Sequence, residues 1–160
     1  MSIDTGDKFL EQFKSITDPI SKILVIHLYC ERGINKLIEV KGKKSEKISQ
    51  WKNRKNRNKF KDFNPLQNSN FVTKIYFAYN MEWINEGLYN NLYLLNTWRN
   101  EYAHNIDVDL EEMNYDFDLL EFDYLNIKDK KDIGENLEYM AIVTIAALHK
   151  CLIQEHNLEY

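Results

Sequence analysis

The chain has 160 residues, the length of one domain, and 44% of them are hydrophobic, which is enough to bury a core without disulfide bonds. Its two prolines and five glycines are few for a turn-rich β protein and favour long helices. The first residues lack a basic stretch followed by an apolar one, and no apolar run reaches the roughly 18 residues of a membrane span, so we expect a soluble, cytoplasmic protein with no membrane partner.

The net charge of −4 conceals two segments of opposite sign. Residues 41–62 contain ten lysines and arginines against two acidic residues, and residues 107–135 contain eleven acidic residues against three lysines. The two segments could neutralise each other, within one protomer or across a dimer. Alternatively, the basic segment could bind phosphate.

Hydrophobic periodicity predicts helices along most of the chain. In chain order we expect a short amphipathic helix over 4–16, a helix from Asp18 to about residue 40, a third over 70–84 and a fourth over 88–103. Asp18 and Pro19 suit the N-cap and first position of the second helix, and Asn85-Glu86-Gly87 is expected to separate the third from the fourth. A last helix is expected over 134–155.

Two segments between these helices lack periodicity. Residues 41–69 are rich in lysine and asparagine and predict a long loop, and residues 105–135 are acidic and irregular. The whole pattern predicts a single all-α domain over residues 1–160, an up-down bundle of four to five helices.

The fourth predicted helix has a seam at 4-3-4-3 spacing, formed by Leu88, Leu92, Leu95, Arg99 and Tyr102. Such a seam packs against a partner helix. Its arginine could be structural and pair with Glu31, Glu82 or Glu86, and His104 could be a cation that complements the helix dipole.

The run from Leu94 to Asn105, Leu-Leu-Asn-Thr-Trp-Arg-Asn-Glu-Tyr-Ala-His-Asn, resembles the R-x4-6-H motif of HEPN domains. It looks most like the Arg-Asn-x-x-Ala-His version of mannitol-operon-repressor-like proteins. The preceding stretch from Phe71 to Asn80 resembles the helix before the motif in those proteins. The resemblance covers about residues 70–105 and implies a helical bundle that dimerises with two motifs face to face.

In nuclease members of the superfamily that shared cleft cuts RNA without a metal, so the resemblance implies a homodimeric endoribonuclease with no cofactor. The RNA would be single-stranded, and the role would be that of a toxin or antiviral effector with an antitoxin or regulatory partner. Toxin members usually carry a tyrosine two residues after the histidine; Ile106 stands there, which disfavours regulation by modification of that position. The alternative function is a non-catalytic regulator acting through protein partners.

Three residues of the motif suit RNA cleavage by attack of the ribose 2′-OH. Histidine is the usual side chain for proton transfer, so His104 can move protons, and the guanidinium of Arg99 matches phosphate oxygens. Five residues on a helix turn through about 500°, so Arg99 and His104 lie about 140° apart, whereas Asn100 and His104 are neighbours. We therefore expect Asn100 to orient the imidazole. Arg99 and His104 can meet only if the helix ends near Ala103 or if a second protomer completes the site.

The basic loop is a second candidate for contact with RNA, because its cations alternate with asparagines between two aromatic residues. Its candidate RNA-binding residues are Lys52, Arg54, Lys55, Arg57 and Lys59; a solvated charged loop is the alternative. His27 is expected in the core, and Cys30 and Cys151 are expected to be buried thiols.

Overall fold

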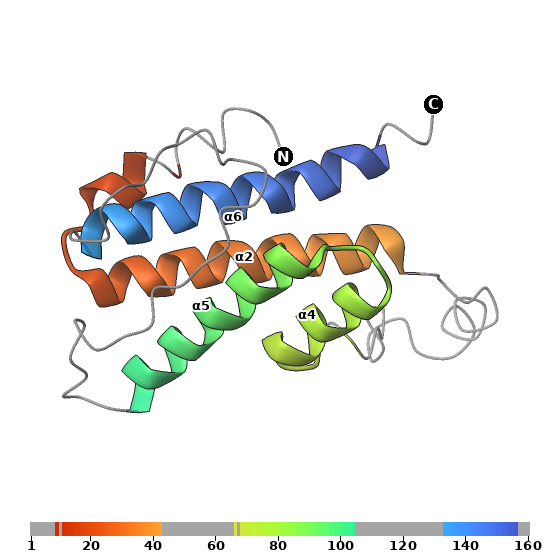
Figure 1. Ribbon diagram of the computed structural model, residues 1–160, viewed down its shortest axis with the longest axis horizontal. Helices are drawn as coiled ribbons and strands as arrows, with labels where there is room; N and C mark the ends of the chain where they lie inside the picture. The colour runs from red at the N-terminus through yellow and green to blue at the C-terminus, as the bar shows by residue number, and fades with distance from the viewer. Residues whose placement is uncertain (1–8, 10, 43–65, 67, 105–132, 157–160) are drawn as a thin grey trace, which may run out of the picture.

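The computed structural model describes residues 9, 11–42, 66, 68–104 and 133–156, with the side chains of the last segment described over 137–153. Within these residues four helices form an all-α bundle, as predicted: α2 (Pro19–Lys41), α4 (Phe71–Asn80), α5 (Glu86–His104) and α6 (Ile133–His156). A helical turn over residues 11–15 precedes α2. In Figure 1, α6 lies along α2, while α5 crosses α2 obliquely with α4 beside its first half.

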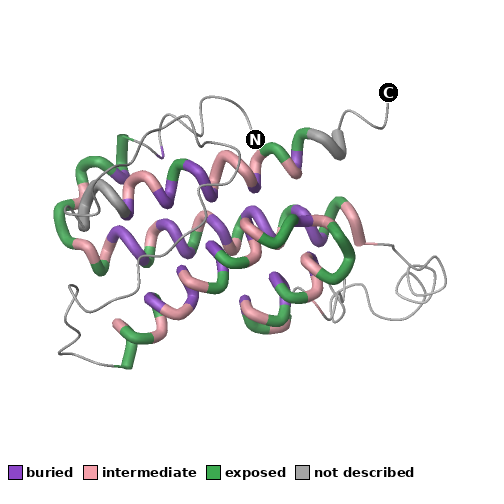
Figure 2. Tube along the Cα trace, in the orientation of Figure 1, coloured by how far each residue is buried: buried purple, intermediate pink, exposed green. Residues whose placement is uncertain are grey.

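Helix α2 begins where the sequence predicts. The Asp18 carboxylate accepts a hydrogen bond from the backbone N–H of Ser21 at 3.0 Å, and Pro19 follows as the first helical residue. The apolar residues of α2 contact α4, α5 and α6, and five isoleucines and leucines are fully buried there: Ile23, Ile26, Ile34, Leu37 and Ile38. Figure 2 shows the resulting buried positions along most of α2.

Close approach of α2 to α6 depends on Gly33. A Cβ built on this residue would overlap Cδ2 of Leu148 and come within 3.0 Å of its Cγ. The same two helices are joined by an ion pair between Lys22 and Glu138, Nζ to Oε1 3.0 Å. Helix α6 also meets α5, where the amide of Asn91 donates to Thr144 Oγ1 at 3.3 Å. None of the described helices is long and apolar enough to span a bilayer.

The boundary between α4 and α5 lies earlier than predicted. Helix α4 ends at Asn80 rather than residue 84, because the backbone N–H groups of Glu82 and Trp83 turn back to the carbonyls of Tyr79 and Ala78. This capping places Glu82 at φ 58°, a conformation usually supplied by glycine. Asn85 lies between the two helices, as predicted, and caps α5, since its Oδ1 accepts a hydrogen bond from Leu88 N at 2.9 Å. Glu86 and Gly87, which were expected to belong to the break, are the first residues of α5.

The two cysteines are free thiols in different environments. Cys30 on α2 is fully buried, as predicted, and burial raises the pKa of its thiol to about 12. Cys151 on α6 is half-buried.

The contact between Gly33 and Leu148 yields a test of the packing. Alanine normally stabilises a helix by about 1 kcal/mol relative to glycine, but overpacking a core costs about 1–3 kcal/mol. Because Leu148 is only 3% exposed and has little room to rotate, we expect Gly33→Ala to lower the free energy of unfolding, measured in urea. In a Leu148→Ala background the same substitution should raise it by about 1 kcal/mol. A stabilising effect in both backgrounds would contradict the close approach.

Candidate functional site

The Arg99, Asn100 and His104 motif lies in the last two turns of α5. The seam that leads to it is buried at Leu88, Leu92 and Leu95, which are at most 1% exposed, but Arg99 itself is exposed. Figures 1 and 2 show the reason: the C-terminal end of α5 projects past α4 and away from α2, and its last turn is exposed apart from Tyr102, which packs half-buried against the core. The seam arginine therefore faces solvent instead of an interhelical contact.

Within one chain, Arg99 and Asn100 are brought together. Nη1 of Arg99 donates a hydrogen bond to Oδ1 of Asn100 at 3.0 Å. This contact holds the guanidinium beside the helix with other N–H donors left for an anion. Among the described residues no ion pair joins Arg99 to the three candidate glutamates, and Glu31 pairs with Lys74 instead. Orientation of His104 by Asn100 stays a prediction.

His104 is helical and exposed, and the structure keeps it apart from Arg99 around the helix axis. Because α5 remains helical through His104, the angle of about 140° between the two side chains is preserved. Helix α5 ends at His104, one residue beyond Ala103, and this end leaves His104 itself helical, so it does not by itself bring the two side chains together within one chain. The predicted RNA-binding residues Lys52, Arg54, Lys55, Arg57 and Lys59 lie outside the described residues.

A polar cluster, buried except for the half-buried Glu31, lies at the junction of α2, α4 and α5, on the inner side of Arg99. Its members are His27 and Glu31 on α2, Lys74 on α4 and Asn96 on α5. Lys74 is 3% exposed, and its Nζ lies 3.5 Å from Oε1 of Glu31. Burial of polar groups costs free energy unless they find partners, so these residues constrain how the three helices pack.

Sequence reasoning placed His27 in the core, as observed, but missed Asn96 and Lys74. Asn96 could have been found, because it precedes Arg99 by three residues and adjoins the apolar seam on the helix surface. Lys74 gave no such signal: a lysine beside isoleucine on a short helix is normally exposed.

Burial lowers the pKa of His27 below its usual value, and the nearby Arg99 cation lowers it further. A hydrogen-bonding contact with Asn96 and the charge of Glu31 act in the opposite direction but do not outweigh burial. The ring packs on Phe71, with centroids 4.5 Å apart, and Nε2 has no hydrogen-bond partner among the described residues. The buried imidazole is therefore favoured in its neutral form.

This preference predicts a pH dependence of stability. A histidine whose pKa is lower in the folded chain binds protons more readily when unfolded. The contribution of neutral His27 to the free energy of unfolding is therefore fully present above the unfolded pKa of about 6.5 and is lost as the pH falls below that value. We expect the free energy of unfolding to fall less steeply between pH 7 and 5 in His27→Gln than in the wild type. His104→Gln, at an exposed position, is the matched control and should retain the wild-type slope. Equal slopes in all three proteins would contradict the assignment.

Comparisons of the chain with protein-family models, with curated protein sequences and with solved structures found no match.

Proposed function

We propose that the protein is a metal-independent endoribonuclease of the HEPN type, acting as a homodimer, with a role as a toxin or antiviral effector. The observation on which this depends is the exposure of Arg99 and His104 in the last two turns of one helix. A purely structural arginine in an apolar seam would be expected to find a carboxylate within the bundle. Here it is directed to solvent and held by Asn100.

The reaction would proceed by attack of a ribose 2′-OH on the neighbouring phosphorus, with departure of the 5′-oxygen of the next nucleotide. One imidazole takes the proton from the 2′-OH, and the other gives a proton to the leaving oxygen. Arg99 stabilises the negative charge on the phosphorane oxygens. Two histidines are needed in different protonation states, and a two-fold axis that brings both protomers' His104 into one cleft supplies them.

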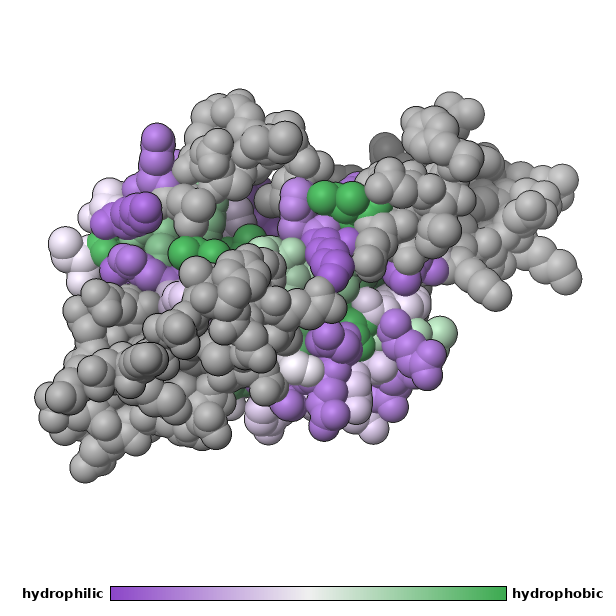
Figure 3. Space-filling view, turned by 45° about the horizontal axis from the view of Figure 1, so that its top comes forward, coloured by the Kyte–Doolittle hydropathy of each residue, from purple (hydrophilic) through white to green (hydrophobic). Residues whose placement is uncertain are grey.

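The angular separation of Arg99 and His104 supports a dimer, because a second protomer can place its His104 opposite the first protomer's Arg99. An exposed apolar ridge on α2 supports it further. Ile20, Leu24 and Leu28 repeat every four residues and are 41%, 42% and 59% exposed. Figure 3 shows more generally that hydrophobic side chains reach the surface between hydrophilic ones.

The position of this ridge relates it to the motif. His27, next to Leu28, lies near Asn96 and Arg99, and α2 runs antiparallel to α5, so the start of α2 lies on the same side of the molecule as the end of α5. Helix α4 has ten residues, whereas α2 has 23, so α4 covers only part of the face of α2 against which it packs. A second copy on this face would bury the ridge and bring two motifs together.

A non-catalytic regulator is the second candidate, and the same ridge favours it. An exposed run of isoleucine and leucine also suits a different protein partner. The two functions differ in what the motif does: a regulator would keep its activity after loss of His104, whereas a ribonuclease would not.

The catalytic proposal is tested with purified protein and a labelled single-stranded RNA. We expect the wild type to cleave it in the presence of EDTA, and His104→Ala to slow cleavage by about 10²–10⁴-fold, the usual contribution of a general acid or base. Arg99→Ala should lower the rate to a similar extent. His149→Ala, a histidine of α6 outside the motif, is the matched control and should cleave at the wild-type rate. Absence of wild-type cleavage, together with unimpaired host growth, would exclude a ribonuclease.

The dimer is tested by sedimentation. We expect a mass of two chains for the wild type and of one chain for Leu24→Asp, because a buried unpaired carboxylate is costly at an apolar interface. Leu24 is 42% exposed within the chain, so the helical circular dichroism should be unchanged. The control is Ile153→Asp on α6, at a position 46% exposed, which should remain dimeric. A wild type that sediments as a single chain would contradict the shared cleft.

A further inference from the structure

Four tyrosines gather on the outer surface of α4 and α5. We call Tyr76, Tyr79, Tyr89 and Tyr93 the tyrosine cluster. The rings of Tyr79 and Tyr89 are stacked, with centroids 4.9 Å apart and planes inclined by 20°, and Tyr93 follows Tyr89 at 6.2 Å. Burial raises the pKa of the Tyr89 hydroxyl, and the nearby hydroxyl groups of Tyr93, Tyr76 and Tyr79 raise it further.

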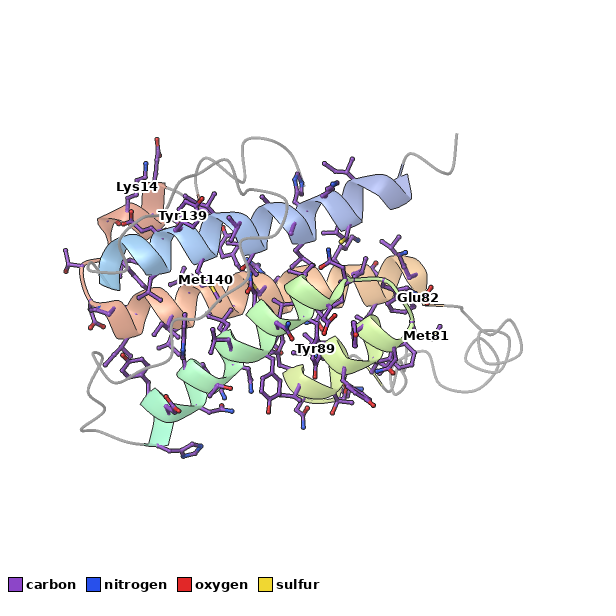
Figure 4. All side chains as sticks on the ribbon, in the orientation of Figure 1. Lys14, Met81, Glu82, Tyr89, Tyr139 and Met140 are labelled. Atoms are coloured by element: carbon purple, nitrogen blue, oxygen red, sulfur yellow. The ribbon has the colours of Figure 1, made fainter. Side chains whose placement is uncertain are left out.

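The cluster has an anchored part and an open part. Tyr79 and Tyr89 are partly buried against the core, and Figure 4 shows Tyr89 between α5 and α4. Tyr76 and Tyr93, in contrast, are 58% and 49% exposed. A rigid inner pair therefore supports two outer rings that are available to another molecule.

The cluster continues along α5 toward the motif. Tyr89, Tyr93, Asn100 and His104 follow one another at intervals of four, seven and four residues, which places them within a sector of about 60° on the helix surface. From Tyr89 to His104 this stripe extends about 22 Å, since each residue advances the helix by about 1.5 Å. Thr97 lies between them and turns its hydroxyl back to the carbonyl of Tyr93 at 3.1 Å.

The charges along α4 and α5 indicate how a ligand would bind there. The two helices contain one lysine and one arginine, the buried Lys74 and Arg99 of the motif, together with the exposed carboxylates of Glu86 and Glu101. The tyrosine cluster therefore offers aromatic faces and hydroxyl groups, and no exposed lysine or arginine for a phosphate. Unpaired nucleobases suit such a surface, because every base has an aromatic face and stacks on a tyrosine ring regardless of its identity.

We propose that the tyrosine cluster binds unpaired bases of single-stranded RNA through Tyr76 and Tyr93 and directs the strand along α5 to His104. This inference rests on the proposed function, because it assigns a substrate-binding surface to the same helix. It differs from the predicted role of the basic loop: the loop would neutralise phosphates, whereas the cluster contributes stacking. A second protein is the alternative occupant, since tyrosines are also common in protein interfaces.

The test measures binding, separately from cleavage, in a His104→Ala parent. The probe is a fluorescein-labelled single-stranded RNA of mixed sequence, followed by anisotropy. We expect Tyr76→Ala and Tyr93→Ala each to raise Kd by roughly 5- to 150-fold, which corresponds to the loss of one base stacked on an aromatic ring. Tyr93→Phe should bind like the parent, because it retains the ring. Tyr139→Ala on α6, on the other side of the molecule in Figure 4, is the control and should also bind like the parent.

A salt series and a mass measurement distinguish the sources of binding. Stacking releases no counterions, so the ratio of Kd between Tyr93→Ala and the parent should be the same at about 50 and 200 mM salt. The sedimenting mass should also be unchanged.

A parent that binds RNA while both alanine variants bind equally well would overturn the cluster's role alone. Alanine variants that lose the dimer would assign the cluster to a protein interface. A parent that binds no RNA would overturn both this inference and the proposed function.

Discussion

Burial of α2 by three other helices is the constraint on which the rest of the structure depends. Its apolar residues contact α4, α5 and α6, and Gly33 lets α6 approach without a side chain between them. Because α5 crosses α2 obliquely, its residues from Leu88 to Trp98 are buried at intervals, whereas Arg99 and His104 near its end are exposed. The exposure of the motif thus follows from the packing angle of a helix whose seam would otherwise continue through Arg99.

The same crossing gives α5 three chemically distinct sides. One side is apolar and packs on the bundle, a second meets the buried polar cluster around His27, and a third carries tyrosines, Asn100 and His104. Arg99 lies next to the second side and His104 on the third. In the proposed homodimer, Arg99 of one protomer and His104 of the other could act on the same phosphate although they lie on different sides of α5. The proposed tyrosine cluster would in addition direct the RNA strand along α5 toward His104.

Helix positions could be predicted from the sequence where capping and periodicity agreed. Asp18 and Pro19 fixed the start of α2, and the apolar spacing located α5 and α6. The end of α4 was wrong by four residues because its cap uses Glu82 at positive φ, where glycine is the usual signal. Asn85 separates α4 from α5 as predicted, but the start of α5 was placed two residues late, because Asn85 caps the helix and Glu86 and Gly87 are already helical. For the candidate site, the burial of His27 could be predicted, and the role of the Arg99 to His104 motif stays a prediction. The exposure of Arg99 and the burial of Lys74 arise from helix crossing, which spacing does not encode.

The two thiols differ in their environments, so the alkylation of Cys30 can be used to measure unfolding of the helical bundle. Thiol reagents attack the thiolate, and Cys30 is both sealed in the bundle and hard to ionise, whereas Cys151 is partly accessible. Alkylation of Cys30 therefore requires α2 to separate from its neighbours. The rate at which this single sulfur is modified measures how often the bundle comes apart, without any label being introduced.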